Sequence, residues 1–120
     1  MVKILLAHEL IEANKTDVDG ITPLLFAAHN GHLEVVKVLL GDERTDVNLA
    51  TREGDSPLIE AVRGVYADVV RVLLEHARID VNQANHMGST PLKEAARDGH
   101  VKTVRALLGA DGVEANKTCR

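Results

Sequence analysis

The stretch Gly20-Ile21-Thr22-Pro23-Leu24 returns twice in this 120-residue chain, each time after 34 residues. The second copy is Gly54-Asp55-Ser56-Pro57-Leu58 and the third is Gly88-Ser89-Thr90-Pro91-Leu92. The same interval aligns residues 2–6, 36–40, 70–74 and 104–108, which all follow a Val-x-x-Leu-Leu-like pattern. A constant period over the whole chain indicates a repeat protein. We therefore expect a single domain, residues 1–120, composed of a partial unit (1–19) and three units (20–53, 54–87 and 88–120, the last truncated at its end).

Each unit predicts two short helices followed by an extended segment. In the first unit, Thr22 is a suitable N-cap and Pro23 suits the first helical position. Apolar residues then recur at helical spacing on both sides of Asn30-Gly31, and a polar stretch leads into Asp46-Val47-Asn48. Helices this short are marginal alone, so stacked neighbours must supply the core. Small residues at one repeat position would let the helices approach closely: Ala27, Ala61 and Ala95. The sequence therefore predicts an all-α repeat solenoid with protruding loops or β-hairpins.

Composition argues against several classes of protein. Lys and Arg number 14 against 18 Asp and Glu, so the net charge of −4 does not suit a nucleic-acid binder. No apolar run approaches the roughly 20 residues that span a bilayer, and we expect no membrane association. The single cysteine, Cys119, cannot form a disulfide within the chain. We therefore expect an intracellular, cytoplasmic location.

These units resemble the ankyrin repeat family. The resemblance rests on the Thr/Ser-Pro-Leu segments, on Gly31-His32 and Gly99-His100, and on Asp-Val-Asn at 46–48 and 80–82. It covers essentially the whole chain. It implies stacked ankyrin helix-turn-helix units that act as a rigid, non-catalytic module for binding another protein.

Several positions depart from the family pattern. The His that usually follows Thr-Pro-Leu is replaced by Leu25, Ile59 and Lys93, so its usual hydrogen bond is not expected. Val65-Tyr66 replaces Gly-His in the middle unit, so a β-branched residue stands at a turn position that favours glycine unless Gly64 takes over by a shift of one. We expect the turn between the helices to be remodelled there. Neither end carries a polar capping repeat, which suggests part of a longer array. With Ile4, Leu5 and Leu6 near one end, we hypothesise weak end-to-end self-association.

No residue set predicts catalysis, a metal or a cofactor. Six histidines are present, but no cysteine or carboxylate completes a metal site around His29 and His32. We expect His32 and His100 to form hydrogen bonds across the helix turn. Ser56 aligns with Thr22 and Thr90, so it is predicted to be a helix cap rather than a nucleophile.

The resemblance implies a concave binding surface formed by the loop tips and the first helices. Arg52, Arg63 and Arg97 stand out within it, because arginine is frequent in interface hot spots. Tyr66 is the one exposed aromatic candidate. Carried over unit by unit, the candidate contact residues are Val18, Asp19, Ile21, His29, Asn30, Arg52, Glu53, Asp55, Arg63, Tyr66, His86, Met87, Ser89, Arg97 and Asp98.

Other functions stay open at this point. The chain could be a spacer or targeting domain of a larger protein or a bacterial effector whose activity lies elsewhere. The irregular middle unit argues against an artificial consensus scaffold. In the ankyrin family, the repeated Asn can also be a substrate for asparaginyl hydroxylation, with Asn48 and Asn82 as acceptors here. Architecture offers a simpler reason for this Asn, because its side chain can bond nearby backbone.

Overall fold

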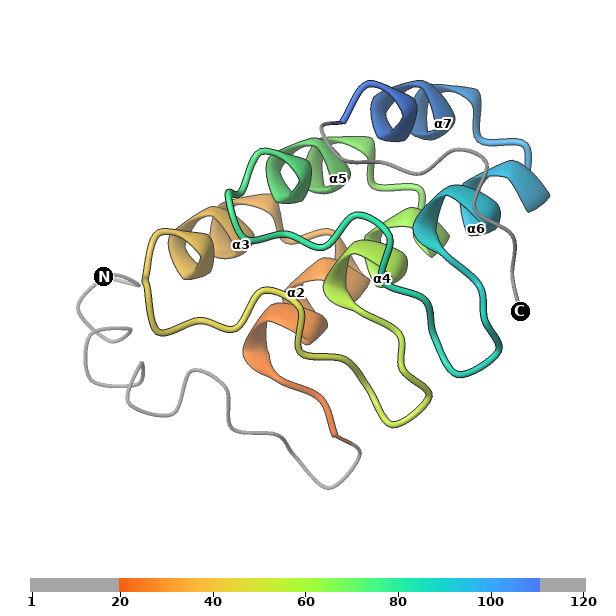
Figure 1. Cartoon of the computed structure of the whole chain (residues 1–120). Helices are drawn as coiled ribbons and strands as arrows, with labels where there is room; N and C mark the ends of the chain where they lie inside the picture. Colours follow the sequence, from red (N-terminus) through yellow and green to blue (C-terminus); the bar gives the residue numbers. More distant parts are fainter. Residues whose placement is uncertain (1–19, 111–120) are drawn as a thin grey trace.

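The computed structural model describes residues 20–110, which form six α-helices and, within that range, no β-strand (Figure 1). The predicted partial unit 1–19 and the end of the last unit lie outside the described residues, as do Ile4, Leu5 and Leu6. The helices, in chain order, are α2 (Pro23–Asn30), α3 (Leu33–Leu40), α4 (Pro57–Arg63), α5 (Ala67–Leu74), α6 (Pro91–Arg97) and α7 (Val101–Leu108). The predicted all-α repeat fold is confirmed.

The first helix of each unit begins in the same way. The side-chain oxygen of Thr22 accepts a hydrogen bond from the backbone N–H of Leu25 at 3.1 Å. Ser56 and Thr90 make the equivalent bond at 3.2 Å each. A proline follows each cap, where its missing N–H costs no helical hydrogen bond. The prediction that Ser56 is a cap is confirmed.

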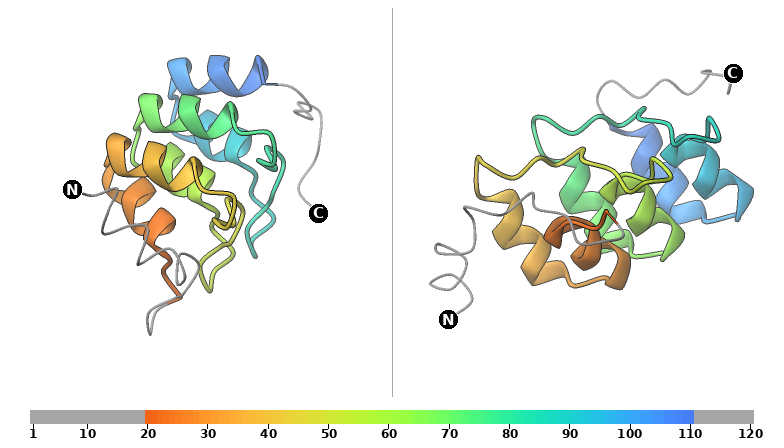
Figure 2. Two further views of the ribbon diagram at one scale, coloured as in Figure 1. Left: turned by 90° about the vertical axis from the view of Figure 1, so that its left-hand side faces the viewer. Right: turned by 90° about the horizontal axis from the view of Figure 1, so that it is seen from below.

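The helices stack in two rows that share one core. The inner row is α2, α4 and α6, and the outer row is α3, α5 and α7, as both views in Figure 2 show. Ala27, Ala61 and Ala95 are buried between neighbouring units, as predicted from their small size. Leu25 and Ile59 take the place of the family's histidine and are fully buried, so apolar packing replaces a hydrogen bond there.

The prediction that the middle turn is remodelled is wrong. Gly31 and Gly99 have φ values of 71° and 72°, and Val65 takes the same left-handed conformation at φ 60°. The next residue, Tyr66, donates its backbone N–H to Ala61 O at 3.1 Å, as the histidines do in the other units. Gly64 does not take over, since its φ is −79°. The middle unit therefore keeps the common turn and accepts a backbone conformation that a β-branched residue adopts only at a cost.

Extended loops connect the units and project away from the helices (Figures 1 and 2). Their tips are closed by backbone bonds from Thr51 N to Asp55 O and from Asn85 N to Ser89 O, both 3.0 Å. Neighbouring tips are joined by the bond from His86 N to Glu53 O at 2.9 Å. Of the two predicted forms, loops or β-hairpins, the described segments are loops.

Asn48 ties one loop to the next. Its Nδ2 donates to Arg78 O at 2.8 Å, and its Oδ1 accepts from Asp80 N at 2.9 Å. The architectural role expected for this Asn is thus confirmed at Asn48, with partners that belong to the following unit. None of the helices within residues 20–110 is both long and apolar enough to cross a bilayer.

Candidate functional site

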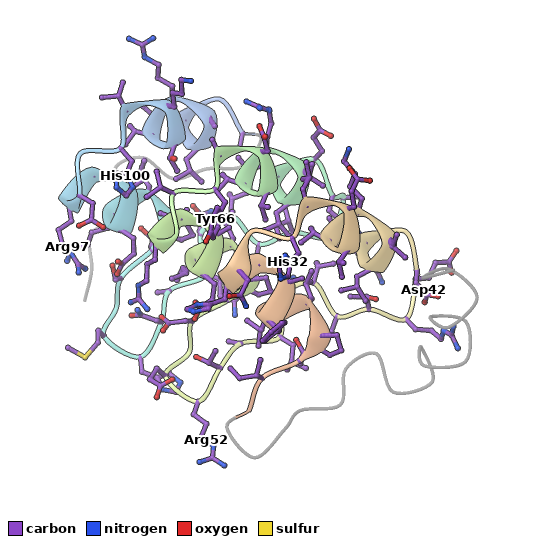
Figure 3. The ribbon with its side chains drawn as sticks, turned by 180° about the vertical axis from the view of Figure 1, so that it is seen from behind. His32, Asp42, Arg52, Tyr66, Arg97 and His100 are labelled. Atoms are coloured by element: carbon purple, nitrogen blue, oxygen red, sulfur yellow. The ribbon has the colours of Figure 1, made fainter. Side chains whose placement is uncertain are left out.

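The exposed sides of α2, α4 and α6, together with the loop tips at residues 52–53 and 86–87, form what we call the inner face. Most of the predicted contact residues lie exposed on or beside it: His29, Asn30, Arg52, Glu53, Arg63, His86, Met87, Arg97 and Asp98. Ile21 is half-buried, and Val18 and Asp19 lie outside the described residues. Figure 3 shows Arg52 projecting from a loop tip and Arg97 from the end of α6.

Asp55 and Ser89 are buried, which corrects their prediction as contact residues. Asp55 Oδ2 lies 2.7 Å from Arg63 Nη1, and its Oδ1 accepts from Asn85 Nδ2 at 2.9 Å. Ser89 Oγ accepts from Arg97 Nη2 at 3.4 Å. Asp55 thus bonds both the helix of its own unit and the next loop, whereas Ser89 bonds the helix of its own unit. We therefore remove them from the predicted contact set.

Side chains on successive first helices pair across the inner face at a fixed offset of 31 residues. His29 Nδ1 on α2 lies 2.7 Å from Glu60 Oε1 on α4. One unit further, Arg63 on α4 donates from Nε to Glu94 Oε1 on α6 at 3.3 Å. We call these contacts the inter-repeat pairs. They fix neighbouring first helices in register.

Glu94 is the centre of the charge network on α6. It accepts from Arg97 Nη2 at 3.0 Å as well as from Arg63. Burial alone would raise the pKa of Glu94, but hydrogen bonds from Ser89 and Arg63 and the charges of Arg63 and Arg97 hold it below its ordinary value. Burial likewise opposes the charge of Arg63, but its bonds to Glu94 and Asp55 raise its pKa.

The acidic members of these pairs were not predicted from the sequence. Glu60 and Glu94 were not predicted as site residues, although each follows a basic or histidine residue by 31 positions. An offset of 31 residues is the repeat length less about one helical turn, so it could have indicated that these side chains lie side by side on neighbouring first helices. Arg63 is therefore a structural residue as well as an exposed one.

Tyr66 lies away from the inner face, on the edge formed by the short turns. Figure 3 places it between His32 and His100, which occupy the same position in the flanking units. Its ring covers Gly31 and Gly64, since a Cβ at Gly31 would come within 2.6 Å of the ring and one at Gly64 would also clash. Tyr66 is therefore partly used in packing between turns, and it is not the one exposed aromatic residue, as predicted, because Phe26 is 59% exposed against 36% for Tyr66.

Within residues 20–110, His32 and His100 bond across the turn through their backbone N–H groups, to Ala27 O at 2.9 Å and Ala95 O at 3.0 Å, and not through their rings. Among the described residues, His100 Nδ1 is buried without a hydrogen-bond partner. The His32 ring instead lies beside Phe26, with ring centroids 6.2 Å apart. Within residues 20–110, no three His, Cys, Asp or Glu side chains are grouped so that they could hold a metal ion.

A shallow groove lies on the opposite side of the stack, between α5 and α7. Its volume is about 840 Å³, and Ala67, Leu74 and Ala106 contribute to its lining beside Arg71, Lys102 and Arg105. None of the predicted contact residues lines it. The groove therefore gives a separate surface against which the inner face can be tested.

Comparison with protein families agrees with this architecture. A family described as ankyrin repeats in three copies matches residues 43–119, and one described as ankyrin repeats in many copies matches residues 5–61. The chain belongs to the ankyrin repeat family. Ankyrin repeats generally serve as protein–protein interaction modules and are typically non-catalytic. No curated protein matches the chain.

Asn48 and Asn82, the two candidate acceptors for hydroxylation, form different hydrogen bonds in this structure. Asn48 uses its side chain and its backbone carbonyl to hold the following unit, the latter by accepting from Gln83 Nε2 at 2.9 Å. The backbone N–H of Asn82 donates to Asp80 Oδ1 at 3.1 Å. Hydroxylation of Asn48 would thus need the loop to open first, and modification at either residue stays a prediction.

Proposed function

We propose that this ankyrin repeat chain is a non-catalytic module that binds a partner protein on its inner face. The observation that carries the proposal is the regular placement of exposed polar side chains on successive first helices. His29, Arg63 and Arg97 occupy one repeat position, and each extends from a helix whose register is fixed by its neighbours.

Rigidity supports this function. The caps fix the start of each first helix, and the bond from His86 N to Glu53 O joins the loop tips. A surface that is ordered before binding loses little conformational entropy when a partner arrives. The inner face can therefore present widely spaced side chains at little ordering cost.

Met87 adds an apolar contact to this polar surface. It lies at a loop tip with 87% of its surface exposed, the most exposed large apolar residue among those described. Methionine adapts its shape to varied surfaces because its side chain is unbranched and flexible. We infer that a partner covers Met87 while polar groups contact the first helices.

A pull-down with two charge-matched variants tests the proposal. The inner-face variant Arg52→Gln plus Arg97→Gln keeps Arg63, whose removal would leave buried carboxylates unpaired. The control, Lys102→Gln plus Arg105→Gln, removes the same charge beside the groove between α5 and α7. We expect the wild type and the control to capture the same protein from a native lysate, and the inner-face variant to lose it.

Circular dichroism of all three proteins must agree for this comparison. Capture that is lost only in the control would place binding on the outer row and contradict the proposed face. If no chain captures a specific protein, the spacer function becomes the better account.

A further inference from the structure

We propose that the inner face binds an acidic segment of its partner, one that presents Asp or Glu carboxylates to the row of first helices. The inference rests on the proposed function and adds the chemistry of the partner. It depends on an asymmetry within the charge pairs of this face.

In each charge pair on the inner face, the acidic side chain is largely buried and the basic side chain is exposed. The side chain of Glu60 is 13% exposed while its partner His29 is 67% exposed. Asp55 and Glu94 are 8% and 3% exposed, against 41% for Arg63. Arg97, which also bonds Glu94, is 57% exposed. A partner that approaches this row therefore meets guanidinium and imidazole groups before it meets carboxylates.

Arg97 keeps donors for an outside acceptor. Within residues 20–110, the hydrogen bonds of Arg97 to Ser89 and Glu94 both use Nη2. Its Nε–H and the two Nη1 hydrogens stay available, and a guanidinium fork suits a carboxylate. The buried carboxylate of Glu94 therefore orients Arg97 without occupying all of its donors.

The distance between neighbouring first helices predicts the spacing of the acidic residues in the partner segment. Packed helices lie about 8–10 Å apart, so equivalent side chains on α2, α4 and α6 recur at about that distance. A partner helix rises about 1.5 Å per residue and would match this with acidic residues seven apart on one side. A polyproline II segment rises about 3.1 Å per residue and would match it with a spacing of three.

The negative charge of the rest of the chain opposes the binding of an acidic segment, so such binding is not expected from net charge alone. Two exposed acids border the face, Glu53 at a loop tip and Asp98 just after α6. The chain as a whole carries a net charge of −4, which favours basic partners through long-range attraction. A preference for acidic segments must therefore come from a local arrangement of basic side chains, and the Lys102→Gln, Arg105→Gln control distinguishes the inner face from the groove between α5 and α7.

Selection from a phage-displayed library of random 12-residue peptides tests the proposal on the full chain. We expect the enriched peptides to be rich in Asp and Glu, with spacings of three or seven. A synthetic copy of an enriched peptide should bind the Arg52→Gln, Arg97→Gln variant at least about fivefold more weakly than the wild type. The Lys102→Gln, Arg105→Gln control should change its affinity less than about twofold.

The outcomes separate this inference from the function it rests on. Enriched peptides that are basic or uncharged, yet lose affinity in the inner-face variant, would overturn the acidic partner and leave the binding face in place. Peptides that bind both variants like the wild type would overturn both. An acidic peptide that binds equally well when its Asp and Glu are replaced by Asn and Gln would also overturn the inference.

Discussion

Val65 has a positive φ of 60° in a turn where the flanking units have glycine. A side chain with a Cβ pays about 1–2 kcal/mol for this conformation. The Val65 side chain is 52% exposed, so little burial compensates it. Other interactions of the unit must therefore offset this cost, and the hydrogen bond from Tyr66 N to Ala61 O is one that stabilises the turn.

Replacing Val65 with glycine should stabilise the chain. The relieved strain exceeds the entropy that glycine loses on folding, and we expect a net gain of about 0.5–1 kcal/mol in the free energy of unfolding. Urea denaturation measures it. The reciprocal change, Gly99→Val, is a matched control because a Cβ at Gly99 meets nothing within 4 Å. It should destabilise by a similar amount, and a less stable Val65→Gly would contradict this account of the turn.

Glu94 should make stability depend on acid pH. Its pKa is lowered in the folded chain, so its contribution is present above the ordinary Glu value of about 4.3 and is lost as pH falls through the lower, folded value. At neutral pH we expect Glu94→Gln to cost about 1–2 kcal/mol, less than a fully buried pair because both arginines are partly exposed.

Denaturation midpoints at pH 7 and pH 3 measure this dependence. The difference between wild type and Glu94→Gln should shrink at pH 3. Glu75→Gln removes an exposed carboxylate and should leave the wild-type dependence intact. An unchanged difference between Glu94→Gln and wild type at the two pH values would show that Glu94 is not the group that titrates.

At the scale of helices and loops, most of the fold could be predicted from the sequence. The 34-residue interval located the helices, and the Thr/Ser-Pro pairs located where the first helices begin. The turn at Val65 could not be predicted, because intrinsic preference argues against a left-handed valine. Packing decides it there: Tyr66 covers Gly31 and Gly64, and this contact needs the common turn.

Ala61 tests the close stacking of α4 between α2 and α6. It is fully buried in the core, and Ala61→Leu should overpack the helix seam and lower the free energy of unfolding by about 1–3 kcal/mol. Urea denaturation measures the effect, with Ala96→Leu on an exposed side of α6 as the control. An Ala61→Leu midpoint equal to that of the wild type would contradict the stacked register.

At the scale of the whole molecule, the candidate site was predicted only in outline. The location of the tips and of Arg97 followed from the repeat register. The roles of Arg63 and Asp55 did not, because besides each other they bond Glu94 and Asn85 of the next unit, about 30 residues away, and those bonds depend on how the units stack. A sequence window within one unit contains only one side of each inter-repeat pair.

Self-association also belongs to the whole molecule and stays a prediction. We expect weak end-to-end association, because a repeat array can extend by stacking one copy on another. Static light scattering over a range of concentrations measures it. A molar mass that rises with concentration would support association, whereas a constant monomer mass at high concentration would contradict it.

The most direct test of the central claim places a photo-crosslinking residue, benzoylphenylalanine, at position 87 or at position 102. Met87 is the exposed apolar residue of the inner-face tips, and Lys102 lines the groove on the opposite row. Neither change alters the stacked core. If partners bind the inner face, illumination in native lysate will join a specific protein to position 87 and not to position 102. Crosslinking at position 102 alone would contradict the account.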